Sequence, residues 1–299
     1  MVVRIVRVRV MANPFVVLVT GAGGQLGREL LWMGKQPGVK VIGLDRNELD
    51  VTDREKCLQV VKLIRPDAVI HTAAYTAVDR AESEPTIAHL VNVTGTRFIA
   101  EAAEIVRARF CYISTDYVFD GKGKRPYLTS DPTGPCTVYG VTKLEGEQIA
   151  LAACSRTFIV RTSWVYGAYG ANFVKTMLKL AKSGKPLRVV DDQIGSPTYT
   201  YDLAETLLQL VRLERFGIYH ASGEGSCSWY RFAQAIFELC QLDIELSPCT
   251  TIDYPLPASR PAYSVLDNES LRREGLKSPR HWREALADFL QKYNNERLT

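Results

Sequence analysis

Short apolar runs alternate with longer amphipathic stretches along the first half of the chain. The runs have the length and β-branched content of strands buried on both faces of a sheet: Phe15–Thr20, Val39–Leu44, Ala68–His71, Phe110–Ser114 and Thr157–Arg161. Helices are predicted between them, from about Gln25, over Asp53–Ile64 with Thr52 or Asp53 as the cap, over Pro85–Ala108, and around Tyr139. Because such strict alternation requires crossover connections, we predict a doubly wound parallel sheet of the α/β class.

The pattern loosens beyond about Ser163, where prolines interrupt the apolar runs. Helices are still predicted in this half, over Asn172–Ser183, Tyr201–Leu213, Trp229–Cys240 and His281–Asn294. We expect a main domain over residues 12–163, to which some later segments return, and a smaller lobe over residues 164–299 that closes over the carboxyl edge of the sheet. Residues 1–11 have arginines among their apolar residues, and we expect them to form a loose extension.

The composition excludes several classes of protein. The 299 residues are 46% hydrophobic and 23% charged, and the net charge of +4 is too small to indicate a nucleic-acid partner. No apolar run approaches the ~20 residues of a membrane helix. The seven cysteines are widely spaced without a C-x-x-C, and the four histidines do not cluster, so we predict reduced thiols, no catalytic metal and a cytoplasmic location.

A loop with a glycine at every third position follows the first predicted strand. Gly21, Gly24 and Gly27 lie between that strand and the helix that begins near Gln25. Glycines permit a tight turn there and let backbone N–H groups, including those of Gln25 and Leu26, approach a pyrophosphate at the helix N-terminus. The loop lacks the G-x-G-x-x-G form, and a glycine-rich turn without a ligand is the alternative. Its position between a strand and a helix nevertheless favours a Rossmann-like dinucleotide site.

Three further segments are placed to complete that site. Asp45 ends the second strand, where a carboxylate binds the adenosine ribose and favours NADH, but the adjacent Arg46 suits the 2′-phosphate of NADPH, so the cofactor stays open. Asp50 and Val51 are expected to border the adenine, with a helix-cap or turn carboxylate as the alternative for Asp50. Small residues in His71–Asp79 would let a cofactor lie close, although tight packing explains them equally well.

Tyr139 and Lys143 lie four residues apart, which places them on one helix face with Cβ atoms roughly 5–6 Å apart. A free tyrosine has a pKa near ~10, and a neighbouring ammonium lowers it by stabilising the phenolate. Thr115, at the end of the fourth strand, is expected to hold a substrate carbonyl beside Tyr139, and Lys143 to bind the nicotinamide ribose. Such a pair occurs on many helix surfaces, but this context predicts an oxidoreductase in which Tyr139 gives a proton to the carbonyl that a nicotinamide hydride attacks.

These motifs together resemble the extended short-chain dehydrogenase/reductase superfamily and, within it, the dTDP-4-dehydrorhamnose reductases. The resemblance extends from about Phe15 to Asp267 and rests on blocks in the same order: Gly21–Gly27, Arg65–Asp67, Ala73–Glu82, Ser114–Asp120, Tyr139–Glu147, Arg161–Gly167, Asn172–Val174, Asp192–Thr198 and Arg260–Pro261. It implies reduction of the C4 ketone of dTDP-4-dehydro-L-rhamnose by NADPH or NADH. It also implies that the catalytic residues are Thr115, Tyr139 and Lys143.

The resemblance assigns further contacts. Those with the cofactor are implied at Gly21, Gly24, Gln25, Leu26, Gly27, Asp45, Asp50, Val51, Ala73, Ala74, Tyr75 and Thr76, and those with the substrate at Val78, Thr115, Asp116, Trp164, Asn172 and Arg260. Trp164 would face the sugar, with a core indole as the alternative, and Arg260 would pair with the diphosphate, with a surface arginine as the alternative.

Some members of the family form a magnesium-bridged homodimer through acidic residues. Glu29 is the matching residue here, although a helix-surface charge is the alternative, and nothing else in the sequence supports magnesium.

Three alternative functions stay open. His71-Thr72 and Cys136-Thr137 depart from the family pattern, so the substrate could be another nucleotide-linked 4-ketodeoxysugar. A 4,6-dehydratase or 4-epimerase shares the fold, but the dehydratases resemble one another in a glutamate two positions after the threonine, where this chain has Tyr117. The third is a non-catalytic regulatory subunit resembling the methionine adenosyltransferase beta subunit, which the intact catalytic group disfavours.

Overall fold

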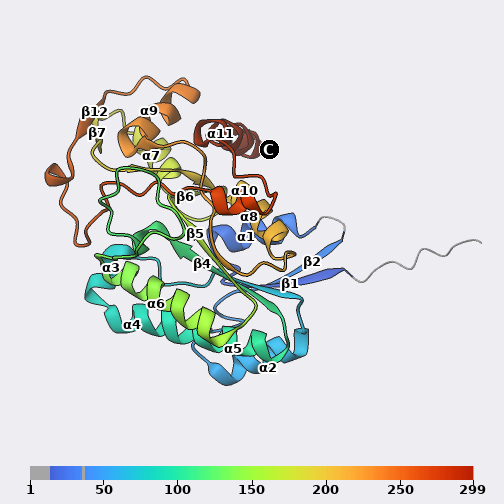
Figure 1. Cartoon of the computed structure of the whole chain (residues 1–299). Coiled ribbons are helices and arrows are strands. Elements are labelled where there is room, and N and C mark those ends of the chain that lie inside the picture. The colour runs from blue at the N-terminus through green and yellow to red at the C-terminus, as the bar shows by residue number, and fades with distance from the viewer. Residues whose placement is uncertain (1–13, 36–37, 299) are drawn as a thin grey trace, which may run out of the picture.

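A six-stranded parallel sheet forms the centre of the protein in the computed structural model, which describes residues 14–35 and 38–298 (Figure 1). The extension predicted for residues 1–11 lies outside the described residues. In neighbour order the strands are β2 (Val39–Leu44), β1 (Phe15–Thr20), β3 (Ala68–His71), β4 (Arg109–Thr115), β5 (Thr157–Thr162) and β10 (Gly217–His220). All five pairings are parallel, so the doubly wound α/β prediction is confirmed. β2 lies on one side of β1, and β3 and the later strands lie on the other. A ligand-binding crevice is expected at the carboxyl ends of the strands, where the order of the strands reverses in this way.

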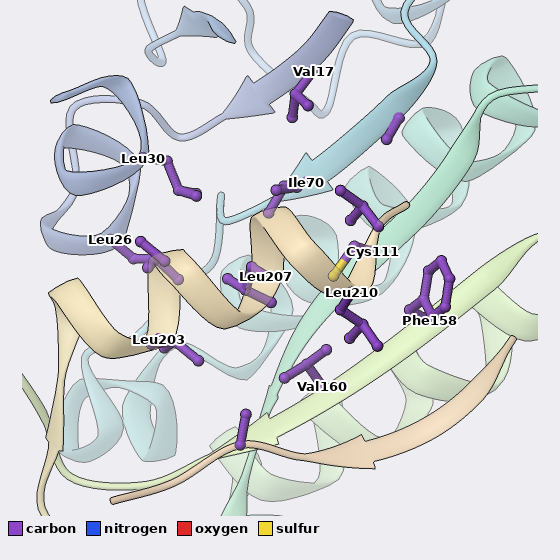
Figure 2. Close-up of a cluster of buried hydrophobic side chains, with 14 of the residues drawn as sticks. Val17, Leu26, Leu30, Ile70, Cys111, Phe158, Val160, Leu203, Leu207 and Leu210 are labelled. Carbon is purple, nitrogen blue, oxygen red and sulfur yellow. The ribbon is translucent and has the colours of Figure 1, made fainter. Parts of the chain in front are cut away.

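Alternate residues of each strand enter two separate cores. On one face, Val17 and Val19 of β1 pack against α1 (Gln25–Met33) and α8 (Thr200–Leu210), and Figure 2 shows the α8 leucines above the sheet. On the other face, Leu18 packs against the helices α2 (Arg54–Ile64), α5 (Thr96–Ile105) and α6 (Val138–Ala153). Because a strand's side chains point to opposite faces in turn, β1 must be apolar on both faces, as its sequence is up to the final Thr20.

A third core joins the helices of the C-terminal part. It is built from α7 (Phe173–Ala181), α9 (Trp229–Leu239) and α11 (Trp282–Leu298), which lie together at one end of the molecule (Figure 1). Short strand pairs border it: β7 (Leu187–Val190) with β12 (Leu246–Cys249), β8 (Ile194–Gly195) with β11 (Cys227–Ser228), and β6 (Val165–Tyr166) with β9 (Thr198–Tyr199). α10 (Glu269–Arg273) and the 3-10 turn Thr251–Asp253 complete this half. The division near residue 163 stays a prediction, and β10 and α8 are later segments that join the sheet layers.

Two helical predictions before β4 need correction. The single helix predicted over residues 85–108 consists of α4 (Pro85–His89), a π-helical turn (Leu90–Gly95) and α5, and the short α3 (Val78–Ser83) was missed. A π turn is one residue wider than an α turn. Its residue Asn92 is bonded to the backbone of Tyr75, which it holds through both its N–H (2.8 Å) and its carbonyl (3.2 Å). The hydrophobic pattern carries no sign of such a local widening.

Two remaining features are the N-terminal cap of α2 and the apolar length of the helices. Asp53 caps α2 by accepting from Lys56 N–H at 3.0 Å, which confirms one of the two predicted caps. Among residues 14–35 and 38–298, no helix is both long and apolar enough to cross a bilayer.

Candidate active site

A cavity of about 1520 Å³ runs along the carboxyl ends of the parallel strands. One side, the sheet wall, includes residues that end or directly follow β1 to β5: Gly21, Asp45, Thr72, Thr115 and Thr162. The opposite side, the C-terminal wall, includes Phe173, Met177, Trp229, Cys249 and Arg260. All residues predicted to bind cofactor or substrate line this cavity except Asn172. The fold therefore brings together side chains from most of the length of the chain, at the place where a doubly wound sheet binds its ligands.

The glycine loop is shaped by the backbone. Gly21 has φ +67°, and a Cβ there would lie 2.6 Å from the amide nitrogen of Ala73. A Cβ at Gly27 would lie 2.6 Å from the carbonyl oxygen of Gly21. Both glycines are thus required by the turn and by close helix packing, whether or not a ligand binds.

Gly23 leaves room that the fold does not need, whereas a Cβ at Gly24 would lie 3.3 Å from the carbonyl oxygen of Gly21. Gly23 is exposed, and a Cβ there would only touch Asp45 at an ordinary 3.5 Å. Gly24 is the N-cap of α1 and has no side chain to satisfy the first helical N–H groups, and no acidic residue occupies the first turn. A bare, positively polarised helix end opening on a cavity fits a pyrophosphate, so these residues can hold a dinucleotide.

Asp45 and Arg46 lie at the end of β2, on the cavity rim. Asp45 Oδ1 accepts from the backbone N–H groups of Asn47 (2.8 Å) and Glu48 (3.2 Å), which commits part of this carboxylate to the turn. Arg46 is exposed and makes no ion pair with any residue that the structure describes. Asp50 accepts from Thr52, whose backbone N–H lowers the pKa of the Asp50 carboxyl most strongly. The predicted turn carboxylate is therefore present at Asp50, beside the cavity.

The Ala73–Thr76 segment and Val78 border the same cavity after β3. Asn92 fixes the backbone at Tyr75, and the Tyr75 hydroxyl donates to Glu84 at 2.5 Å. Tyr75 is therefore held by Asn92 and by Glu84, the residue that follows α3, and it lines the cavity together with Ala73 and Ala74.

Thr115, Tyr139 and Lys143 meet at the centre of the sheet wall. Thr115 is 5% exposed and donates its hydroxyl hydrogen to Asp116 Oδ1 at 3.0 Å. Tyr139 and Lys143 extend from the first turns of α6, and Lys143 Nζ donates to the carbonyl of Ile113 at 2.6 Å. The ammonium also lies 3.9 Å from the centre of the Tyr112 ring.

The prediction that Lys143 lowers the pKa of Tyr139 is wrong for the protein alone. Burial raises the pKa of Tyr139 to about 12, with hydrogen bonding from Thr115 opposing and the charge of Asp116 adding to the rise. Burial also lowers the pKa of Lys143 to about 7. The reason is that Lys143 is turned to the Ile113 carbonyl and the Tyr112 face. Tyr139 therefore keeps its proton at neutral pH, which is the form that a proton donor requires.

A buried ion pair lies behind this group. Arg161 on β5 makes two hydrogen bonds to Glu147 on α6, at 2.9 and 2.7 Å, and Ser114 adds a third to the same carboxylate. Both charged side chains are 3% exposed. The charge of Glu147 raises the pKa of Lys143 and so opposes the effect of burial. We predicted no role for Glu147 or Arg161, although the four-residue spacing from Lys143 to Glu147 was visible.

Trp164 lines the cavity rather than only filling the core. Its ring lies 3.5 Å from that of Trp229, within 6° of parallel, and its backbone is left-handed with φ +48°. A Cβ at Gly195 would collide with this indole. Strained backbone that the surroundings hold in place is typical of functional sites. Trp229 was not predicted, because its partner comes from 65 residues earlier in the chain.

Arg260 forms an ion pair at the cavity. Its guanidinium donates to Asp79 at 2.7 Å and its side chain is 17% exposed, so the alternative of a surface arginine is wrong. It extends into the cavity while being held by Asp79.

Asn172 and Glu29 have structural partners instead. Asn172 caps α7 by accepting from Lys175 N–H at 3.1 Å and donates to Gln25 Oε1 at 3.1 Å, and it does not line the cavity. Glu29 is 4% exposed and accepts from the Thr200 hydroxyl at 2.8 Å, because α1 packs against α8. The alternative of a charge on the helix surface is therefore wrong, and a magnesium role for Glu29 stays a prediction. Within the described ranges, no three His, Cys, Asp or Glu side chains gather closely enough to hold a metal ion.

The parallel sheet, the glycine loop and the Thr115–Tyr139–Lys143 group define an oxidoreductase fold of the short-chain dehydrogenase/reductase type. The family described as the RmlD substrate binding domain matches residues 15–295, and the chain belongs to that family.

Individual relatives agree with this assignment. The chain is 47% identical to the spore coat polysaccharide biosynthesis protein SpsK of Bacillus subtilis, covering 92% of this chain and 96% of that one. It is 44% identical to the dTDP-4-dehydrorhamnose reductase of Aggregatibacter actinomycetemcomitans, covering 91% and 97%. The solved structure of dTDP-4-dehydrorhamnose reductase from Bacillus anthracis in complex with NADP is 41% identical, with a TM-score of 0.91 over 93% of this chain and 99% of that one.

Proposed function

We propose that this protein reduces the C4 ketone of dTDP-4-dehydro-L-rhamnose to dTDP-L-rhamnose with NADPH or NADH. One observation carries the proposal: a single cavity joins an uncapped glycine-rich helix end to Tyr139, a half-buried tyrosine that keeps its proton. A relative named for this activity, 44% identical over nearly its whole length, supports the choice of substrate.

Each residue of the group has a separate task in this proposal. The nicotinamide supplies the hydride. Tyr139 gives its phenolic proton to the ketone oxygen, and the Thr115 hydroxyl orients that oxygen. Lys143, anchored on the Ile113 carbonyl, keeps its remaining N–H groups for the cofactor ribose. Arg260, held by Asp79, contributes a cation for the diphosphate of the nucleotide sugar.

Cofactor choice follows from the residues after β2. One carboxylate oxygen of Asp45 accepts hydrogen bonds from the backbone of the turn that follows it. Arg46 beside it has no ion-pair partner in the described part of the chain. An unpaired guanidinium suits a 2′-phosphate, so we expect NADPH to be preferred over NADH. The relative solved with NADP supports this preference. A homodimer and a cytoplasmic location stay predictions.

The test is direct. The protein is mixed with dTDP-4-dehydro-L-rhamnose and either NADPH or NADH, and the loss of nicotinamide absorbance is followed. We expect turnover with both cofactors and a lower KM for NADPH. Cofactor oxidation no faster than without protein would refute the proposal.

A reductase of another nucleotide-linked 4-ketodeoxysugar is the second candidate. The relative at 47% identity is named for spore coat polysaccharide biosynthesis and not for that sugar, which favours keeping this possibility. Competition between dTDP-4-dehydro-L-rhamnose and other 4-ketodeoxysugar nucleotides, ranked by kcat/KM, distinguishes the two.

Dehydration and a purely regulatory role fit the site less well. The position of the dehydratase glutamate holds Tyr117, whose ring meets that of Tyr139 edge-on at 5.5 Å and offers no carboxylate base. A regulatory subunit would not need Thr115, Tyr139 and Lys143 to share one cavity.

A further inference from the structure

The hydrogen bonds of Thr115 limit what its hydroxyl can do. A hydroxyl has one hydrogen to donate and two lone pairs to accept with. Thr115 Oγ1 donates to Asp116 Oδ1 at 3.0 Å and accepts from the Tyr117 N–H at 3.2 Å. An ionised carboxylate can only accept, so as long as Asp116 is charged it holds the only hydrogen of Thr115. The threonine then has one lone pair left, which can accept from Tyr139 but can give nothing to a ketone.

Reduction of a ketone requires this hydroxyl to donate its hydrogen to the substrate. Negative charge develops on the ketone oxygen as hydride arrives at the carbon, so that oxygen needs donors. If Asp116 carries a proton, its own O–H donates to Thr115 Oγ1 and replaces the bond that the threonine donated. With the Tyr117 N–H on the other lone pair, the hydrogen of Thr115 is released toward the cavity.

We propose that Asp116 works in its protonated form, as a positioning residue that turns the Thr115 hydroxyl toward the substrate oxygen. The proposal rests on the reductase function above. No net proton leaves Asp116, and Tyr139 remains the group that gives its proton to the product.

The surroundings of Asp116 raise the share of its protonated form. The residue is 3% exposed, its Oδ2 makes no hydrogen bond, and it forms no ion pair with a described residue. Burial raises the pKa of Asp116 to about 6, although the hydroxyls of Ser264 and Thr115 oppose the rise. A substrate that displaces water from the cavity would raise it further.

The other groups near Asp116 are mostly uncharged at neutral pH. Tyr139 faces it from α6, Tyr117 follows it in the chain, and Ser264 approaches from the segment before α10. Arg260 and Asp79 are the charged residues nearby. They shift the pKa of Tyr117 in opposite directions, and they form an ion pair with each other.

The expected pH dependence has a definite sign. A carboxyl that must be protonated works below its pKa, so kcat should fall as the pH rises through the pKa of Asp116, at or above about 6. Lys143, with its pKa lowered to about 7, could produce a similar fall. A pH profile of the unmodified protein therefore does not by itself identify the group.

The deciding experiment compares Asp116→Asn with Asp116→Ala. The asparagine NH2 can donate to Thr115 at any pH, as the protonated acid does, whereas alanine cannot. We expect Asp116→Asn to keep kcat within about tenfold of the unmodified protein at low pH and to lose the fall toward alkaline pH. Asp116→Ala leaves the Thr115 hydroxyl without an orienting partner, and the misplaced donor should lower kcat about 10²-fold. Asp120→Asn, at an exposed carboxyl four residues away, is the matched control and should leave the profile unchanged.

A second readout does not depend on turnover. Infrared difference spectra between the unmodified protein and Asp116→Asn should show a carboxylic acid band that disappears as the pH is raised through about 6. An alkaline fall that persists in Asp116→Asn assigns it to Lys143 and overturns the proposal, as does a loss in Asp116→Asn equal to that in Asp116→Ala. An Asp116 that is ionised throughout overturns it too. Absence of turnover in the unmodified protein would instead refute the reductase function.

Discussion

The two walls of the cavity are built by different interactions. The sheet wall is held by hydrogen bonds and buried charges: Lys143 on a backbone carbonyl, Thr115 on Asp116, and the Glu147–Arg161 pair behind them. The C-terminal wall is held by stacked rings such as Trp229 on Trp164, and its rim has exposed apolar side chains, among them Tyr254 at 60%. We therefore expect the sheet wall to resist displacement of single atoms and the C-terminal wall to adapt by repacking of its side chains.

This difference separates chemistry from selectivity. Proton transfer depends on tenths of an ångström, which hydrogen bonds to sheet backbone can maintain. Recognition of a sugar nucleotide depends on area and on a few charges, which rings and loops can supply in many arrangements. Substitutions in the sheet wall should therefore change kcat or stability, and substitutions in the C-terminal wall should change KM.

Tyr139→Phe should have the largest effect. Removing the proton donor is expected to lower kcat about 10²- to 10⁴-fold, while the affinity for NADPH stays within about twofold. Steady-state kinetics and a fluorescence titration of the cofactor measure the two quantities. Tyr201→Phe, on α8 outside the cavity, is the control and should behave like the unmodified protein. Near-normal turnover of Tyr139→Phe would mean that Tyr139 does not donate the proton and that the sheet wall does not carry the chemistry.

Glu147→Gln should have the largest effect on stability. It leaves the Arg161 charge, 3% exposed, without its counter-ion, so the free energy of unfolding should fall by about 3–5 kcal/mol. Urea denaturation followed by circular dichroism measures the change. Glu269→Gln, which breaks an exposed pair with Arg273, should cost less than about 1 kcal/mol. Equal losses in the two variants would contradict a rigid sheet wall.

Arg260→Ala tests the charge on the C-terminal side. Charge-assisted hydrogen bonds contribute about 1.5–3 kcal/mol, so KM for the nucleotide sugar should rise about 10- to 100-fold with kcat nearly unchanged. Arg125→Ala, which breaks an ion pair with Asp131 outside the cavity, is the control and should leave KM as it is. A fall in kcat with KM unchanged would place Arg260 in the chemistry rather than in binding.

Trp229→Leu should have the smallest effect. Losing the stack on Trp164 removes about 0.5–1.5 kcal/mol, which predicts a two- to tenfold rise in KM for the nucleotide sugar and unchanged affinity for NADPH. Trp32→Leu, a half-exposed indole away from the cavity, controls for general destabilisation. A weaker NADPH complex in Trp229→Leu would mean that the two walls are not separate.

The sequence alone was enough to predict five strands of the sheet, the glycine loop and the Thr115–Tyr139–Lys143 group, but it did not predict the sixth strand, β10. These features are local: a strand buried on both faces is apolar throughout, a tight turn needs glycine, and a four-residue spacing places two side chains on one helix face. Their order along a doubly wound chain also determined that they would meet, because parallel strands bring their carboxyl ends to one edge.

The tertiary structure decided what each side chain contacts. Glu29 is buried because α8 covers its face of α1, Asn172 is used as a cap, and Trp229 meets an indole from a distant segment. The high pKa of Tyr139 and the raised pKa of Asp116 come from burial, to which every layer of the fold contributes. Spacing along a chain specifies which groups share a face, but the loss of water around a group depends on all the elements that pack over it.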